Sequence, residues 1–216
     1  MIRKPDTCEG CPLHTTGKGF VPDKIVENEE YLVYGEAPGT TEISKGEPFV
    51  GKAGFVLRQW LMKAVPQLQI ALEKNQISFC NVLKCLPPEQ KGRPYPTGDT
   101  RRQAEEHCHQ YAPMIRAKTV ILCGEVPQRH LFGSELEAED ASDKRLGHDL
   151  RGVMGRVGRD IEKDGKRYVF APHPAFILRQ PSLVGHGQQA LQIAAGTDCV
   201  LEPEYKDWEL AMRELQ

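Results

Sequence analysis

The sequence YLVYGEAPG, residues 31–39, joins a short apolar run to a loop of glycine, proline and glutamate. Apolar, β-rich runs of this kind recur along the chain, and helix-like sequence separates each run from the next. The runs are Tyr31–Gly35, Ile77–Cys85, Thr119–Gly124 and Tyr168–Ala171. This alternation is typical of βαβ units, so we expect an α/β fold: a three-layer α/β/α sandwich around a central, mainly parallel four-stranded sheet.

Two segments between these runs have the period of an amphipathic helix. One of them carries an apolar stripe made by Phe55, Val56, Trp60, Leu61 and Ala64. The other segment is Gln103–Ala117. The proline-rich segment Leu86–Gly98 is expected to form an exposed loop, and Pro203–Leu215 a terminal helix that packs against the sheet.

The composition is that of a soluble globular protein. Of the 216 residues, 39% are hydrophobic and 27% are charged, and no linker, repeat or low-complexity tract interrupts them. We therefore expect a single domain over residues 1–216 and, without an interface signature, a monomer. No stretch approaches the ~20 apolar residues of a membrane span. No apolar run follows the basic N-terminal residues, so we expect a cytoplasmic protein with no membrane partner.

Seven cysteines in a cytosolic chain favour metal binding over a disulfide framework, because the cytosol keeps thiols reduced. Cys8 and Cys11 form a C-x-x-C pair, and Cys85 and Cys108 would complete four ligands. Zinc and a 4Fe–4S cluster both fit this set. Ordinary buried thiols are the alternative, and they are the expectation for Cys80, Cys123 and Cys199, although Cys80 could replace Cys85 as a ligand.

The loops that follow the four runs are the expected place of function, because parallel sheets bind ligands at the carboxyl ends of their strands. These loops read GEAPG, NVLKCLPP, GEVPQ and APHPAFILRQP. One further stretch, GEPFVGKA at residues 46–53, nearly matches a phosphate-binding loop. We reject that reading because Ala53 has no hydroxyl for magnesium and Pro48 has no amide for phosphate.

The net charge of −2 hides a basic segment. Residues 144–179 contain nine lysines or arginines against four aspartates or glutamates. Such a segment is typical of a solvated basic face or of a surface that binds nucleic acid.

Four motifs occur together: GEAPG at residues 35–39, GEPFVGKAG at 46–54, NVLKC at 81–85 and HPAFILRQP at 173–181. In their order and approximate spacing, and with the four cysteines, the chain resembles the family 4 uracil-DNA glycosylases, which carry an iron–sulfur cluster. The resemblance covers nearly the whole chain; each motif alone is weak, and their conjunction is strong. It implies a uracil-DNA glycosylase-like fold and a DNA repair enzyme that flips uracil out of DNA, hydrolyses its N-glycosidic bond and leaves an abasic site.

The resemblance also implies roles for individual residues. Cys8, Cys11, Cys85 and Cys108 would hold a 4Fe–4S cluster, with zinc as the less favoured alternative. The partner would be uracil-containing DNA, and Gly35 and Ala37 of GEAPG would belong to the uracil pocket.

Three side chains would recognise the base. Phe49, expected to be exposed in its glycine-bounded loop, would stack on the flipped uracil. Asn81 carries a donor and an acceptor on one amide, which suits uracil N3–H and O4 and opposes the amino edge of cytosine. His173 would donate a hydrogen bond to uracil O2 as negative charge develops on the leaving base.

A carboxylate would complete the catalytic set. Glu36 of GEAPG would either orient the attacking water or stabilise the cationic sugar, and Glu42 is a weaker candidate for the same role. Residues 176–181 resemble a DNA-inserting loop, with Leu178 and Arg179 as the inserting side chains and Arg151 as a phosphate contact.

Some features depart from the family pattern. Leu86 stands where many relatives carry arginine, a difference that bears on lesion context and strand preference. A related group crosslinks to uracil-DNA through a histidine after the second strand; no histidine lies between Cys85 and His107, so we expect turnover. Two rival readings remain: a glycosylase of the same fold for another damaged base, and a zinc-stapled DNA-binding protein without catalysis.

Overall fold

The computed structural model describes residues 2–88, 99–111, 114–142, 160–180 and 184–196. Within these residues a five-stranded sheet has the order β2-β1-β3-β5-β4. Four of its strands are parallel, which confirms the four predicted strands and their direction. They are β1 (Tyr31–Gly35), β2 (Ile77–Asn81), β3 (Thr119–Cys123) and β5 (Lys166–Ala171).

The fifth strand, β4 (Asp160–Lys163), was not expected. It pairs antiparallel with β5 at the sheet edge. Asp164 and Gly165 form the turn between them, both with positive φ (52° and 70°), as a two-residue hairpin turn requires. Because β4 lies on an edge and is largely exposed, it lacks the apolar run by which the other strands were found.

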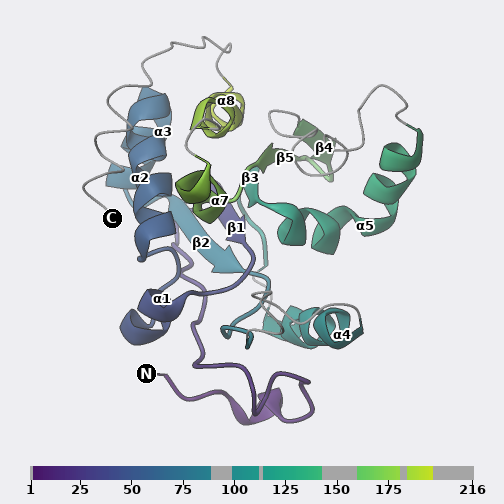
Figure 1. The fold of residues 1–216 in the computed structure, drawn as a ribbon. Coiled ribbons are helices and arrows are strands. Elements are labelled where there is room, and N and C mark those ends of the chain that lie inside the picture. Colours follow the sequence, from purple (N-terminus) through teal and green to yellow (C-terminus); the bar gives the residue numbers. More distant parts are fainter. Residues whose placement is uncertain (1, 89–98, 112–113, 143–159, 181–183, 197–216) are drawn as a thin grey trace.

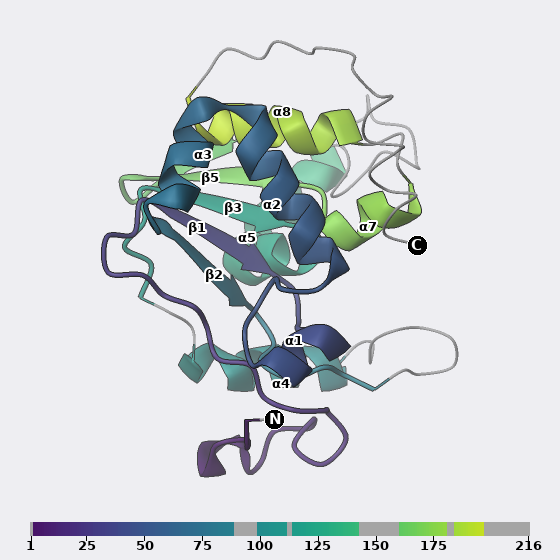
Figure 2. The same ribbon diagram turned by 90° about the vertical axis from the view of Figure 1, so that its left-hand side faces the viewer.

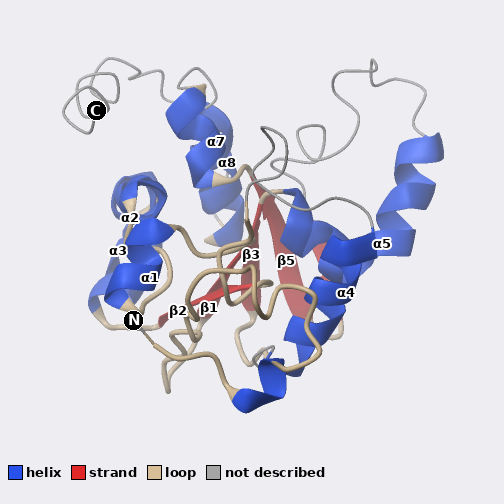
Figure 3. Cartoon of the chain, turned by 60° about the horizontal axis from the view of Figure 1, so that its bottom comes forward, coloured by secondary structure: helices blue, strands red, loops and turns tan. Residues whose placement is uncertain are grey.

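Helices cover both faces of the sheet, which confirms the three layers (Figures 1 and 3). On one face lie α2 (Lys52–Ala64), α3 (Pro66–Glu73), α7 (Pro174–Arg179) and α8 (Val184–Ala194), as Figure 2 shows. The opposite side carries α4 (Asp99–Cys108) and α5 (Glu125–Ser142). The short helix α1 (Thr40–Lys45) follows β1, between Gly39 and the left-handed Gly46 (φ 72°).

Alternate residues along the strands feed two separate cores, as a parallel sheet buried on both faces requires. Val33, Ile121 and Val169 pack with the helices of the α2 face. Leu32 and Leu122 pack on the opposite face with side chains of α5.

Both predicted helices exist with altered details. In α2, Val56, Trp60 and Leu61 are buried as expected, whereas Phe55 is 43% exposed and therefore does not belong to the buried stripe. The second helix is α4, which starts at Asp99 and ends at Cys108, followed by one 3-10 turn at His109–Tyr111. The expected continuation to residue 117 was wrong because Pro113 lacks the amide hydrogen that a continuing helix needs.

The N-terminal segment runs beneath the carboxyl edge of the sheet, beside α1 and α4 (Figure 1). It contains one 3-10 turn at Asp6–Cys8. The ammonium group of Lys4 donates hydrogen bonds to the carbonyls of Leu13, His14 and Gly17, at 2.9, 2.6 and 2.6 Å. These hydrogen bonds therefore fix the path of the segment, although its regular secondary structure is limited to this single turn.

Several expectations fall on residues outside the described ranges: Cys199, the terminal helix Pro203–Leu215, Arg151 and most of the Leu86–Gly98 loop. In the part of the chain that is described, no helix combines the length and apolar character that crossing a membrane demands.

Candidate active site

The loops after β1 and β2 lie side by side because their backbones continue to pair beyond the strands. The amide of Val82 donates to the carbonyl of Gly35 at 3.0 Å, and that of Leu83 donates to Glu36 at 2.9 Å. This pairing brings the GEAPG loop against the NVLKC segment at the carboxyl edge of the sheet. The functional site was predicted from the sequence to lie at this edge.

A pocket of about 420 Å³ opens at this edge. Five of the predicted site residues line it: Ala37, Phe49, Asn81, His173 and Leu178. Leu86, Ala175 and loop residues 38–42 and 51–53 form the rest of its wall. Side chains from four separate loops thus meet around one cavity of the size of a small-molecule site.

Phe49 has a backbone conformation that a bulky residue adopts only under constraint, with φ at 56°. Its ring is 5% exposed and packs at 5.8 Å between centroids against Phe79, so the expectation of an exposed side chain was wrong. Gly54 makes this conformation possible, because a Cβ there would lie 1.9 Å from the carbonyl oxygen of Phe49. The ring therefore forms a fixed wall of the pocket.

Gly35 lies directly under the pocket. A Cβ at this position would come within 2.5 Å of both the Asn81 Oδ1 atom and the Phe49 ring. The absence of a side chain at Gly35 thus lets Asn81 and Phe49 approach each other over the end of β1. Gly35 therefore shapes the site although its own atoms do not line the cavity.

His173 begins α7 as its N-cap residue, with Pro174 at the first helical position. Its Nδ1 atom accepts a hydrogen bond from the Ala175 amide at 3.1 Å, so in the neutral ring the proton sits on Nε2. Burial, and then the positive charge of Arg179, lower the pKa of His173 to about 4. At neutral pH the side chain is therefore an uncharged donor.

Glu36 does not line the pocket. Its carboxylate lies 3.6 Å from the guanidinium of Arg101 in α4. Burial raises its pKa, and the positive charge of Arg101 offsets part of that increase.

Glu42, the weaker candidate, is the carboxylate that does line the pocket. It is buried, and it accepts hydrogen bonds from the Gly39 and Gly51 amides at 3.1 and 2.8 Å. These bonds tie the GEAPG loop to the loop that carries Phe49. Glu42 therefore holds the two loops together.

The expected DNA-inserting loop is helical. Residues 176–179 belong to α7, because the His173 cap and Pro174 start a helix that ends at Arg179. Leu178 lines the pocket, whereas Arg179 is exposed and stacks over the Phe176 ring at 5.9 Å. The two side chains are thus placed at the pocket rim and on the surface beside it.

The four predicted ligand cysteines lie around one pocket. Cys8, Cys11, Cys85 and Cys108 line one small pocket between the N-terminal segment, the loop after β2 and the end of α4. All four are free thiols. Among the described residues, no three cysteine, histidine or carboxylate side chains converge closely enough to hold a single metal ion.

Burial raises the pKa of the Cys11, Cys85 and Cys108 thiols, to about 12 for Cys85. Backbone amides lower the cost of a thiolate at two of them: the Leu13 amide donates to the Cys11 sulfur at 3.4 Å, and the Lys84 amide acts in the same way on Cys108. Hydrogen bonds to sulfur of this kind are typical of cysteines that ligate a metal cluster. The donor set and its surroundings fit such a group.

Cys80 and Cys123 are ordinary buried thiols, as expected. They lie within β2 and β3 with no exposed surface and face opposite cores of the sheet. Cys80 lies apart from the thiol pocket, so it does not substitute for Cys85.

A buried ion pair was not predicted from the sequence. Lys84, the fourth residue of NVLKC, is 3% exposed at its side chain and forms an ion pair with Asp23, which is 9% exposed. A lysine between the buried residues Leu83 and Cys85 was the available signal for Lys84. Asp23 offered none, because it lies in the N-terminal segment outside every motif.

The chain is similar in sequence to known proteins. A family model for the uracil DNA glycosylase superfamily matches residues 22–195. The chain is 30% identical over 185 residues to the type-4 uracil-DNA glycosylase of Archaeoglobus fulgidus, covering 85% of this chain and 84% of that protein. It is also 30% identical over 205 residues to the enzyme of the same name from Pyrobaculum aerophilum, covering 91% and 93%. The corresponding protein of Sulfurisphaera tokodaii is 26% identical over 181 residues, which cover 82% and 74%.

Proposed function

The chain belongs to the uracil DNA glycosylase superfamily, and we propose that it is a type-4 uracil-DNA glycosylase that excises uracil from DNA. The observation that carries this proposal is the meeting of Phe49, Asn81 and His173 around one pocket. The reaction is hydrolysis of the N-glycosidic bond, which releases free uracil and leaves an abasic site. We propose that the enzyme acts as a monomer in the cytoplasm.

The pocket supplies both contacts that an extruded base needs. Extrusion costs a few kcal/mol of base stacking in DNA, and stacking of the base on a fixed aromatic side chain offsets part of this cost. Phe49 offers that wall, and the Asn81 amide would pair with uracil N3–H and O4. Cytosine presents an acceptor and a donor at these two positions, so one orientation of Asn81 cannot serve both bases.

His173 would stabilise the leaving group. Its neutral Nε2–H, fixed by the Ala175 amide on the other ring nitrogen, would donate to uracil O2 as that oxygen gains negative charge. A donor that forms its strongest bond in the transition state raises the rate of bond cleavage.

Glu36 is our proposal for the carboxylate that orients water or stabilises the cationic sugar. Both roles need the ionised form, and the neighbouring Arg101 supports it against the effect of burial. Leu178 at the rim would fill the gap that the flipped base leaves, with Arg179 beside it on the DNA. Arg151, outside the described residues, stays a proposed phosphate contact.

We propose that Cys8, Cys11, Cys85 and Cys108 hold a 4Fe–4S cluster. The shared pocket and the amide hydrogen bonds to sulfur support this assignment. When bound, the cluster would supply binding energy that fastens the N-terminal segment to the loop after β2. Lys4, which lines the same pocket, would then offset part of the negative charge of the thiolates.

Substituting the ligand cysteines provides a prediction for this centre. Cys85→Ser is expected to remove most of the iron, roughly four atoms per chain in the intact protein, together with its brown colour. Cys123→Ala is the matched control, because its buried thiol lies within β3, and it should keep full iron content. Iron and sulfide analysis with visible absorption measures the outcome; a colourless wild type that binds stoichiometric zinc would contradict the cluster.

A panel of lesions tests the substrate. Oligonucleotides that contain a single uracil, hypoxanthine, thymine or cytosine are incubated with the protein, and abasic sites are read by alkaline cleavage. We expect cleavage of the uracil strand and protection of the thymine and cytosine strands. Preferred cleavage of the hypoxanthine strand would support a same-fold glycosylase for another base instead.

A further inference from the structure

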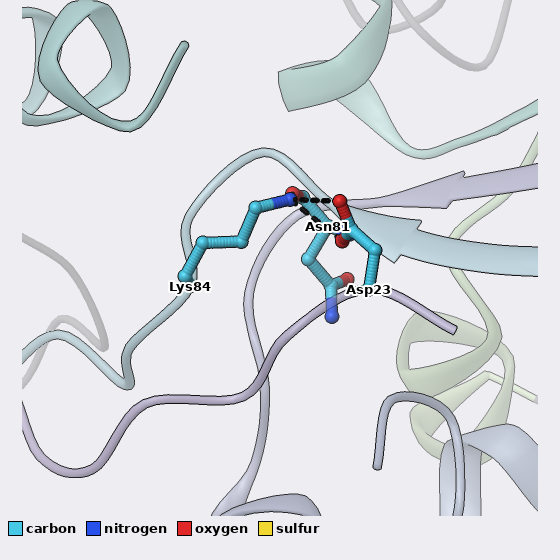
Figure 4. A network of polar contacts seen from close by, with 3 residues as sticks. All are labelled: Asp23, Asn81 and Lys84. Atoms are coloured by element: carbon cyan, nitrogen blue, oxygen red, sulfur yellow. Dashed lines mark hydrogen bonds and ion pairs between the residues drawn. The ribbon is translucent and has the colours of Figure 1, made fainter. Parts of the chain in front are cut away.

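The buried ion pair of Asp23 and Lys84 holds the backbone of Asn81 by hydrogen bonds, and we call this set of contacts the grip (Figure 4). The Lys84 ammonium group donates to both carboxylate oxygens of Asp23, at 2.6 and 2.8 Å, and to the Asn81 carbonyl at 2.5 Å. The Asn81 amide in turn donates to Asp23 Oδ1 at 3.4 Å. The side-chain amide of Asn81 points away from this pair and remains free to face a ligand (Figure 4).

The local sequence explains why the backbone needs this grip. β2 is an edge strand of the sheet, and its outer side pairs with the N-terminal segment through a bridge between Lys24 and Phe79. Continuing that antiparallel register would set Pro22 opposite Asn81. Proline has no N–H, so no backbone donor would reach the Asn81 carbonyl there. The Lys84 ammonium supplies the missing donor, and Asp23 supplies the acceptor for the Asn81 amide.

The burial of the pair is physically costly. Removing two charges from water usually returns little net stability, and well-packed apolar side chains of similar volume often serve as well or better. At 3% and 9% side-chain exposure, Lys84 and Asp23 belong to this class. A purely structural explanation therefore accounts poorly for an ion pair at this position, whereas a fixed hydrogen-bond geometry at Asn81 accounts for it directly.

We propose that Asp23 and Lys84 are positioning residues, which fix the backbone of Asn81 so that its amide meets uracil in one orientation. This inference rests on the proposed function and deepens it by naming what aims the base-reading side chain. Neither residue lines the pocket, so their contribution to base recognition acts through Asn81.

The test uses the double variant Asp23→Leu/Lys84→Met in the iron-loaded protein. Removing both charges avoids leaving one of them buried and unpaired, so folding and iron content should be retained. The first readout is backbone hydrogen exchange. The Asn81 amide should exchange at least ~10-fold faster, while Val82, bonded to Gly35, and Phe79, bonded to Lys24, stay unchanged.

The second readout is uracil excision. The double variant should lose at least ~10-fold in kcat/KM, and combining it with Asn81→Ala should lower kcat/KM little beyond the loss caused by Asn81→Ala alone, because residues that act through one another are non-additive. The control Asp160→Asn/Arg167→Met removes another ion pair, 2.5 Å long, between β4 and β5, and should leave kcat/KM unchanged. A general folding defect would instead multiply with the loss caused by Asn81→Ala.

Each of the possible results tests one part of the proposal. If the Asn81 amide hydrogen exchanges at the wild-type rate in the double variant, Asp23 and Lys84 do not fix the Asn81 backbone. If it exchanges faster while kcat/KM is unchanged, fixing this backbone does not position the side chain for uracil. A wild-type protein that releases no uracil refutes the proposed function alone, since the exchange experiment still judges the grip.

Discussion

Replacing Asn81 by aspartate is expected to lower uracil excision by ~10²- to 10⁴-fold, because a buried site built to hydrogen-bond a substrate loses most when a partner is wrong. The carboxylate is nearly isosteric with the amide and still accepts from uracil N3–H. It has no hydrogen to donate to O4, so two oxygens would face each other. Asn81 is 5% exposed, and little water would reach the mismatch to relieve it.

The measurement is single-turnover cleavage of a uracil oligonucleotide, with a cytosine oligonucleotide beside it. The variant should lose uracil cleavage, and any residual activity should shift toward cytosine, whose amino group offers a donor. Asn28→Asp, the same change on an exposed residue, is the matched control and should behave as the wild type. Wild-type rates in Asn81→Asp would mean that this amide does not read the base.

Replacing His173 by alanine is expected to lower kcat by ~10²- to 10³-fold at neutral pH, the usual loss when one preorganised donor to a developing anion is removed. The effect should fall on kcat more than on KM, because the bond to O2 is strongest in the transition state. His186→Ala, which removes an exposed histidine from α8, is the control and should leave kcat unchanged.

The pH dependence of the wild type separates two roles for His173. With its pKa lowered to about 4, the ring is neutral across pH 5 to 8, and the rate should show no step from this group there. A cationic general acid would instead lose activity as the pH rises. The same shift has a stability consequence: its ordinary pKa of 6.5 applies in the unfolded chain, so the protein loses stability as the pH falls from 6.5 toward 4.

The fold could be predicted from the sequence where burial leaves a local pattern. Each parallel strand is covered on both faces and reads as a continuous apolar run, so all four were found. The edge strand β4, largely exposed, carries no such run. Its only local mark is the Asp164-Gly165 turn, whose two positive φ angles suit a hairpin.

The candidate site was predictable in its members and less so in their arrangement. Phe49, Asn81 and His173 belong to the sequence motifs near the carboxyl ends of the strands, and the parallel sheet brings these ends together. The burial of Phe49 against Phe79, the pairing of Glu36 with Arg101 and the grip of Asp23 on Asn81 all join residues distant in sequence. No local pattern encodes such contacts; they follow from tertiary packing.

The cysteines illustrate the same division. The C-x-x-C spacing of Cys8 and Cys11 marks a ligand pair locally, whereas Cys85 and Cys108 join it only because the loop after β2 and α4 both pack on the N-terminal segment. Cys80 and Cys123 lie within the strands and do not line the thiol pocket, so they do not belong to the set.

The most direct test of the central claim is release of free uracil from a single-uracil oligonucleotide by the iron-loaded protein, compared with an Asn81→Ala/His173→Ala double variant. Chromatography of the released base and alkaline cleavage of the strand give two independent readings. We predict release of uracil and strand cleavage by the wild type, with neither from a double variant of equal iron content and fold. Intact uracil-DNA after incubation with folded, iron-loaded wild type would contradict the assignment.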